Sequence, residues 1–238
     1  MTFLVRIGVL NRVVVPSDFV KIDLQRFSYT FKSDNKIVLI DNCLSDSFCS
    51  LKFINRFSPG TGSIKDIAVF GKVAHHKGHD VIVELAREYP SLCFHFVGGK
   101  LPGSEVFYEM LAERAPNNVV FWGAVESISD FICSHQIQIS IVPSRWSEPF
   151  GLVAIESMAC SCLTISSGRG GLEQISKNTS MLCFNLDDRD SLGRLIDSLL
   201  CEDGKALTNA ARLQYLRTQH IYSKEVFSEK LLKLIRDL

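Results

Sequence analysis

The sequence has no excess of charge of either sign. Lys and Arg together number 26, as do Asp and Glu, and the bases are scattered rather than clustered. Binding along a phosphate backbone requires a basic surface, and docking on an anionic membrane requires a polybasic segment. We therefore expect no nucleic-acid partner and no electrostatic membrane anchor.

Metal-binding spacings are missing too. The eight cysteines include no Cys-x-x-Cys pair, and the six histidines stand at no ligand spacing. Several cysteines lie within apolar runs, such as Cys93 between Leu92 and Phe94. We expect small buried thiols in a reducing compartment and no bound metal.

Several catalytic and targeting signals are also absent. There is no Walker loop, no Gly-x-Ser-x-Gly elbow and no Gly-x-Gly-x-x-Gly after the first expected strand. The missing dinucleotide fingerprint disfavours a dehydrogenase or a flavodoxin-like protein. The apolar segment Met1–Val15 carries Arg6 and Arg12 and is too short to span a bilayer. We predict a cytoplasmic protein, with peripheral contact at the inner face of the membrane left open.

What the sequence does contain is a regular alternation of segments. Hydrophobic residues make up 46% and charged residues 22%, the balance of a globular domain. Short apolar runs, typical of strands buried on both faces, cover Ile64–Phe70, Leu92–Val97, Val119–Trp122, Ile137–Val142, Cys162–Ser166 and Met181–Phe184. Amphipathic stretches between and after them predict helices over His79–Tyr89, Glu105–Ala115, Ser127–His135, Leu152–Cys160, Arg189–Cys201, Lys205–Gln219 and Lys224–Leu238.

This alternation predicts an α/β fold with a doubly wound parallel sheet. Right-handed crossovers bring the carboxyl ends of the strands to one edge, where such sheets bind ligands. The start differs: we expect strand over Phe3–Val15, helix over Asp18–Phe27, strand over Lys36–Asp41 and a loop or linker over Asn42–Ser63. We expect this opening to be a fragment of a second sheet rather than a complete domain.

The loop after the first strand of the main sheet, Gly71–Gly78, is the first candidate site. Its two glycines allow tight backbone paths, and Lys72 and Lys77 are expected near the start of the following helix. Two ammonium groups beside free N–H donors suit a diphosphate. Two surface lysines in an ordinary loop explain the same residues equally well.

The loop Pro143–Gly151 is the second candidate. Pro149 suits the start of a helix, where its missing N–H costs nothing. Gly151 leaves neighbouring backbone amides open to an anionic group of a ligand. Glu148 stands just before the helix, where a carboxylate also complements the helix dipole.

Glu156 interrupts the apolar stretch Leu152–Ala159. A carboxylate among apolar neighbours needs a partner. The hydroxyls of a ribose meet this need, and a structural Arg or Lys meets it as well. We favour the ligand.

Two further segments carry weaker signals. The glycine-rich loop Ser166–Glu173 suits a cradle for polar ligand groups, and a plain turn fits it equally. The run Asp188-Arg189-Asp190 spells Asp-x-Asp. Because it precedes an apolar helical stretch, we expect it to cap that helix rather than to hold a metal.

Taken in order, these segments resemble glycosyltransferase family 4. The string Glu148-Pro-Phe-Gly-Leu-Val-Ala-Ile-Glu156 resembles the Glu-x7-Glu motif of that family. The other matching segments are Gly71-Lys72-x4-Lys77-Gly78, Phe96-Val-Gly-Gly99, Asn118-Val-Val-Phe-Trp-Gly123 and Gly170-Gly-Leu-Glu173. The resemblance covers residues 64–200, followed by a final helix of the family's type.

The resemblance implies a GT-B fold, in which two Rossmann-like domains enclose the active site. It also implies a nucleotide-sugar donor, no cofactor and no essential metal. The sugar is transferred with retention of configuration to a glycan or lipid-linked acceptor, as in polysaccharide or lipopolysaccharide synthesis. The catalytic residues it places are Lys72, Lys77 and Glu148, and the donor-binding residues are Gly71, Phe150, Gly151, Leu152 and Glu156.

Each of these residues takes a role from the resemblance. Glu156 binds the ribose and Glu148 the donor sugar or its surroundings. Lys72 and Lys77 stabilise the leaving diphosphate. The family commonly has Arg at the position of Lys72, and Lys keeps the charge but loses the bidentate fork. A second departure is Ser161-Cys162-Leu163, which replaces the usual Gly-x-Pro.

The resemblance also divides the chain. Residues 1–62 correspond to a remnant of the N-terminal domain with the interdomain linker, residues 63–222 to the nucleotide-sugar-binding domain, and residues 223–238 to a helix that packs back toward the N-terminal domain. A complete N-terminal domain needs roughly 150–180 residues. We therefore expect mainly the donor-binding half of a truncated transferase, inactive alone unless a separate acceptor domain completes it.

Two alternatives stay open at this point. The chain can be a non-catalytic nucleotide-sugar-binding remnant or a subunit of a split enzyme, since the motifs are the same in each case. Sugar-nucleotide epimerases share the GT-B architecture, but the Glu-x7-Glu string favours a transferase.

Overall fold

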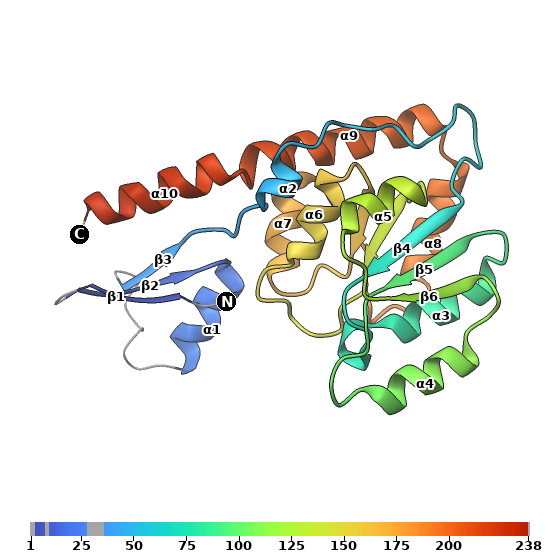
Figure 1. The fold of residues 1–238 in the computed structure, drawn as a ribbon, viewed down its shortest axis with the longest axis horizontal. Coiled ribbons are helices and arrows are strands. Elements are labelled where there is room, and N and C mark those ends of the chain that lie inside the picture. Colours follow the sequence, from blue (N-terminus) through green and yellow to red (C-terminus); the bar gives the residue numbers. More distant parts are fainter. Residues whose placement is uncertain (1–2, 8–9, 28–35, 238) are drawn as a thin grey trace.

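The computed structural model describes residues 3–7, 10–27 and 36–237, with side chains from residue 13 onward. Residues 8–9 of the predicted strand segment Phe3–Val15, and Leu238 at the end of the last predicted helix, lie outside the described residues. The described chain forms two sheets of unequal size (Figure 1).

The larger sheet has six parallel strands, which confirms the predicted fold class. They are β4 (Asp66–Phe70), β5 (Cys93–Val97), β6 (Val119–Gly123), β7 (Ile139–Val142), β8 (Leu163–Ser166) and β9 (Leu182–Cys183), in the spatial order β6-β5-β4-β7-β8-β9. In this order the chain starts in the middle, winds to one edge, and then returns to wind toward the other. The reversal between β4 and β7 leaves a crevice at their carboxyl ends.

Helices cover both faces of this sheet. They are α3 (His79–Glu88), α4 (Glu105–Arg114), α5 (Ile128–Ser134), α6 (Leu152–Ala159), α7 (Gly171–Thr179), α8 (Ser191–Cys201) and α9 (Gly204–Ile221). Alternate residues of β4 enter two different cores: Ile67 packs with residues of α3 and α8, and Ala68 packs with residues of α5 and α6. Burial on both faces explains why the strands are continuous apolar runs.

The smaller sheet lies beside the larger one. Strand β1 (Phe3–Ile7) runs antiparallel to β2 (Leu10–Val15), and β3 (Ile37–Leu39) runs parallel to β2. Its small core contains Val13, Val15 and Ile37, against which α1 (Asp18–Phe27) packs. The last helix, α10 (Lys224–Arg236), continues from α9 past this sheet (Figure 1). There Lys230 Nζ lies 2.8 Å from Asp41 Oδ2.

The segment predicted as a loop or linker, Asn42–Ser63, is more ordered than expected. It contains a short helix, α2 (Asp46–Cys49), and buries Leu44, Phe48 and Phe57. Its apolar residues follow no helical or strand period, which is why no helix or strand is predicted here. They are instead spaced to fit against the helices of the larger unit.

Ser161 stands where the family resemblance expects glycine. Its φ of 68° is left-handed, a conformation that costs a non-glycine residue about 1–2 kcal/mol. The Ser161 hydroxyl accepts a hydrogen bond of 3.0 Å from the backbone N–H of Ile54. The replaced segment still leads directly into β8, so the departure leaves the strand order unchanged.

The expectation of buried thiols is wrong for most of the cysteines. Only Cys160 and Cys162 are buried, whereas Cys133, Cys183 and Cys201 are exposed, and all eight are free. An apolar neighbourhood in the sequence indicates an element, but the position within the helix or strand decides which side chain faces the core.

The run Asp188-Arg189-Asp190 is predicted to cap the helix that follows it. Asp190 is the N-cap residue of α8, but its side chain makes no capping hydrogen bond, and Asp188 forms an ion pair with Arg194. Among the described helices, none is both long enough and apolar enough to cross a membrane.

The contact between the linker segment and α9 generates a test. A Cβ added at Gly204, the first residue of α9, would lie 1.8 Å from the Ser58 carbonyl oxygen. At Gly193, inside α8, the nearest atom would be 3.6 Å away. We expect Gly204→Ala to lower the free energy of unfolding by about 1–3 kcal/mol. Gly193→Ala should raise it by about 0.5–1 kcal/mol. Urea unfolding of both variants measures this, and equal effects contradict the packing argument.

Candidate functional site

A cavity of about 400 Å³ lies at the crevice between the carboxyl ends of β4 and β7. Its walls come from the loop after β4, the loop after β7 and the start of α6. Pro16 and Asn42 also line it, from the smaller unit, which comprises β1, β2, α1, β3 and the residues that directly follow β3. Seven of the predicted site residues line it: Gly71, Lys72, Lys77, Glu148, Phe150, Gly151 and Leu152. Glu156, the eighth, does not.

Lys77 and Glu148 form an ion pair inside this cavity. Lys77 lies in η3 (His75–Lys77), the short 3-10 helix that precedes α3, and its Nζ is 2.7 Å from Glu148 Oε1. The hydroxyl of Ser144 donates a hydrogen bond to the same oxygen. The two residues are 71 positions apart in the sequence, and they meet because their loops follow adjacent strands.

The environment of Glu148 has two opposing effects on its pKa. Burial works to raise it, because a carboxylate loses water. The hydrogen bonds from Lys77 and Ser144 and the positive charge of Lys77 work in the other direction and prevail. The pKa of Glu148 therefore lies below its usual range, and the residue is an anion at neutral pH.

The start of α6 offers hydrogen-bond donors beside this pair. Within the described chain, the backbone N–H groups of Phe150, Gly151 and Leu152 donate to no other residue, as expected for the first turn of a helix. Gly151 has φ of 116°, and a Cβ there would approach Leu172 Cδ2 to 2.5 Å. Only glycine fits this position, and it leaves the amides accessible to an anion or a hydroxyl.

The glycine-rich loop Ser166–Glu173, whose sequence suits a ligand cradle and a plain turn equally, packs against the segment that carries Glu148. None of its residues lines the cavity. Gly170 pairs with Glu148 as a β-bridge, and the N–H of Gly171 donates a 2.6 Å hydrogen bond to the Glu148 carbonyl oxygen. The loop therefore fixes the backbone of Glu148. From the other side, the hydroxyl of Ser17 donates to the Pro149 carbonyl oxygen.

Glu156 and Lys72 are less committed to protein partners. Lys72 is exposed and has no ion pair within the described residues. Glu156 is half-buried, one turn beyond Leu152, and burial alone raises its pKa. The structural Arg or Lys considered as its partner is absent from the described part of the chain.

His79, which no sequence motif singles out, also lines the cavity. Its side chain is buried, and neither ring nitrogen has a hydrogen-bond partner among the described residues. Burial lowers its pKa to about 4, against the opposing effect of the Ala74 carbonyl. The ring is therefore neutral at physiological pH and adds no third positive charge to the cavity. Only its place directly after Gly78 at the start of α3 could have drawn attention to it.

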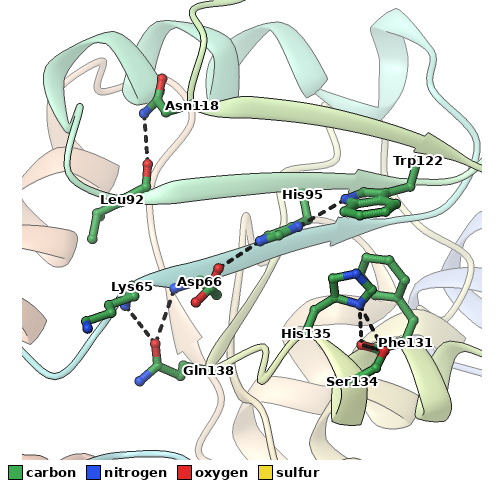
Figure 2. A network of polar contacts seen from close by, with 10 residues as sticks. All are labelled: Lys65, Asp66, Leu92, His95, Asn118, Trp122, Phe131, Ser134, His135 and Gln138. Atoms are coloured by element: carbon green, nitrogen blue, oxygen red, sulfur yellow. Dashed lines mark hydrogen bonds and ion pairs between the residues drawn. The ribbon is translucent and has the colours of Figure 1, made fainter.

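A second polar cluster lies outside the cavity, and it contains the candidate metal ligands. Asp66, Cys93 and His95 offer one ligand atom each, all within 4.8 Å of one another. Asp66 and Cys93 are the first residues of β4 and β5, at the edge of the sheet opposite the cavity. Figure 2 shows Asp66 and His95 in a chain of hydrogen bonds that continues to Trp122.

That chain of hydrogen bonds works against a metal. The indole N–H of Trp122 donates to His95 Nδ1 at 3.0 Å, and His95 Nε2 lies 2.9 Å from Asp66 Oδ1. Because an indole nitrogen only donates, Nδ1 must accept, and a neutral ring then carries its proton on Nε2, directed at Asp66. A metal at Nε2 would have to displace that proton and break the contact with Trp122. The arrangement fits a structural network.

A second cavity, of about 650 Å³, lies between α3, α4 and α8. The ion pair between Arg145 Nη2 and Asp80 Oδ2 forms part of its wall. None of the predicted site residues lines it. Its walls carry charges of both signs, which favour no single class of ligand.

Comparisons with known proteins show what the chain is similar to. Residues 54–214 match the family model described as "Glycosyl transferases group 1". The chain is 24% identical over 164 residues to a Klebsiella pneumoniae protein described as an uncharacterized 42.6 kDa protein in the cps region. The aligned region covers 68% of this chain and 40% of that protein. Among the solved structures similar to this chain are two whose identities are low enough that they show the fold alone.

The first is sucrose-phosphate synthase from Thermosynechococcus elongatus, with 21% identity and a TM-score of 0.76, covering 95% of this chain and 58% of that one. The second is Anabaena HepE in complex with UDP-glucose, with 17% identity and a TM-score of 0.78, covering 95% of this chain and 64% of that one. The chain thus spans less than two thirds of the length of each relative. These neighbours place its architecture in the GT-B class.

The unpartnered carboxylate of Glu156 generates a stability prediction. Its pKa is raised in the folded state, so the ionised form is destabilising, and the penalty is greatest at pH above that raised pKa. We expect Glu156→Gln to raise the free energy of unfolding near neutral pH. The gain should shrink as the pH falls and Glu156 becomes protonated in both states. Urea unfolding at several pH values measures this, and a gain that does not depend on pH would refute it.

Proposed function

Because the chain belongs to the glycosyl transferases group 1 family, we propose that its cavity binds a nucleotide-diphosphate sugar and that the protein transfers that sugar to a glycan or lipid-linked acceptor. The transfer is proposed to proceed with retention of configuration, as in family 4. The observation that carries the proposal is the meeting of Lys77, Glu148 and the open amides of α6 at one cavity.

The charges at the cavity support a diphosphate-binding end. Two ammonium groups and a helix N-terminus form a positive end that suits a diphosphate. As the bond to the sugar breaks, negative charge grows on the leaving phosphate, and Lys72 and Lys77 are placed to stabilise it. No proton transfer is needed for that step, so the charge of the two lysines carries it.

The carboxylates suit the other parts of the donor. Glu148 is held as an anion at the cavity and can accept hydrogen bonds from sugar hydroxyls. Glu156 lies about one turn into α6 and has no ion-pair partner within the described residues, which suits the two hydroxyls of a ribose. The relatives support the substrate class: one solved neighbour is a complex with UDP-glucose, and the Klebsiella protein lies in a cps region. A surface polysaccharide is the acceptor class that we propose.

A second candidate function is a donor-binding module that acts with a separate acceptor-binding domain. The coverage of 58% to 64% of the solved neighbours favours keeping it. In this case the chain binds the nucleotide sugar, and transfer requires the other domain. Both candidates make the same prediction for the cavity, so donor binding is the first property to test.

Calorimetric titration with UDP, GDP and dTDP, without added metal, provides that test. We expect saturable binding of one nucleotide. Glu156→Gln, in which the carboxylate alone is changed, should weaken binding of the ribonucleotide by about 1.5–3 kcal/mol. No binding of any of the three by a folded chain would refute the proposed function.

The Lys77–Glu148 ion pair predicts opposite effects for changes of its two members. Lys77→Ala should weaken binding of the nucleoside diphosphate far more than binding of the nucleoside, because the phosphates lose their cation. Glu148→Gln should strengthen nucleoside diphosphate binding, because it frees Lys77 and removes a negative charge near the phosphates. The same variant should lose the extra affinity that the attached sugar provides. Weaker diphosphate binding by Glu148→Gln would contradict the assignment.

A further inference from the structure

Trp146 is an exposed tryptophan at the edge of the cavity. It lies in the loop between β7 and α6, two residues before Glu148, and is 48% exposed. It is not among the residues that line the cavity. The backbone N–H groups of Arg145 and Trp146 both donate to the His76 carbonyl oxygen, at 2.8 and 3.3 Å. This ties the loop to η3, which carries Lys77.

The indole ring is anchored before any ligand arrives. The Trp146 side chain lies close enough to the Glu148 carboxylate to contribute to lowering the pKa of Glu148. The ring of His76 meets it edge to face, with centroids 6.0 Å apart and an angle of 69°. The indole is therefore held by its ring contact with His76 and by the loop's backbone hydrogen bonds to His76, and close to half of the residue stays open to solvent.

This combination matches the two kinds of surface on a sugar ring. A pyranose has hydroxyl groups around its rim and C–H groups on its faces. A carboxylate recognises the hydroxyls, and a flat aromatic surface packs against the C–H groups through dispersion and the hydrophobic effect. Because Trp146 lies beside the Glu148 carboxylate and against His76, a sugar whose hydroxyl binds Glu148 is within reach of the indole.

We propose that Trp146 is a stacking surface for the pyranose ring of the donor, and that it makes the site prefer a nucleotide sugar over the bare nucleoside diphosphate. This inference rests on the proposed function, because Glu148 is placed at the donor sugar only by that function. Its specific content is that the sugar, rather than the base or the phosphates, touches the indole.

Binding measurements on variants test the proposal. Trp146→Ala should weaken the binding of UDP-glucose by about three- to tenfold and leave the affinity for UDP unchanged. Trp146→Phe keeps an aromatic face and should retain most of the preference for the sugar. If calorimetric titration shows that the protein binds GDP or dTDP instead of UDP, the pair GDP and GDP-mannose or the pair dTDP and dTDP-glucose is measured in the same way. Equal losses for nucleotide and nucleotide sugar, or no loss for either, would overturn the assignment.

Fluorescence gives an independent readout, because the chain has two tryptophans. Trp122→Phe leaves Trp146 as the sole reporter, and its emission should change with the nucleotide sugar but not with the nucleotide. Trp146→Phe leaves Trp122, whose emission should respond to neither. A response of Trp146 to the nucleotide alone would indicate stacking on the base and would overturn the proposal.

Two further outcomes distinguish the sources of the sugar. If methyl glucoside added to the nucleotide-saturated protein changes Trp146 emission while the nucleotide sugar does not, the ring belongs to the acceptor and the donor assignment is wrong. If no nucleotide binds, both the proposed function and this inference are overturned. Nucleotide binding without any role for Trp146 overturns the inference alone.

Discussion

The reversal of strand order between β4 and β7 is the constraint on which the rest of the site depends. Parallel strands joined by right-handed crossovers must all end at one edge, and the reversal places the loops after β4 and β7 side by side. Lys77 and Glu148 come from these two loops. Their ion pair exists because the sheet brings together two loops that the sequence holds far apart.

Some of the polar groups near this crevice are paired with one another and others have no partner. Lys77 compensates Glu148, whereas Glu156 and the ring nitrogens of His79 have no partners within the described chain. Leaving such groups unpaired costs stability, and a domain selected for stability alone would replace them with apolar residues. His79 lines the cavity and Glu156 lies in the helix whose start lines it, which is the pattern expected where a ligand supplies the missing partners.

The smaller unit contributes to the site in spite of its size. Pro16 and Asn42 line the cavity, and Ser17 holds the carbonyl of Pro149 at the start of α6. Through Asp41 and Lys230 the last helix is linked to the same unit. The position of α6 is therefore supported from both sides: by the glycine-rich loop of the larger unit and by the strand–helix turn of the smaller one.

The sequence by itself determined the parallel α/β sheet, its strands and helices, and the two loops at its ligand-binding edge. Those features depend on local periodicity and on the order of elements, both of which are written in the chain. It did not determine the pairing of Lys77 with Glu148, the hydrogen bonding of the Glu148 backbone by Gly170 and Gly171, the incomplete burial of most cysteines, or the Asp66–His95–Trp122 network. Each of these depends on which residues of distant segments face each other, and only the tertiary structure decides that.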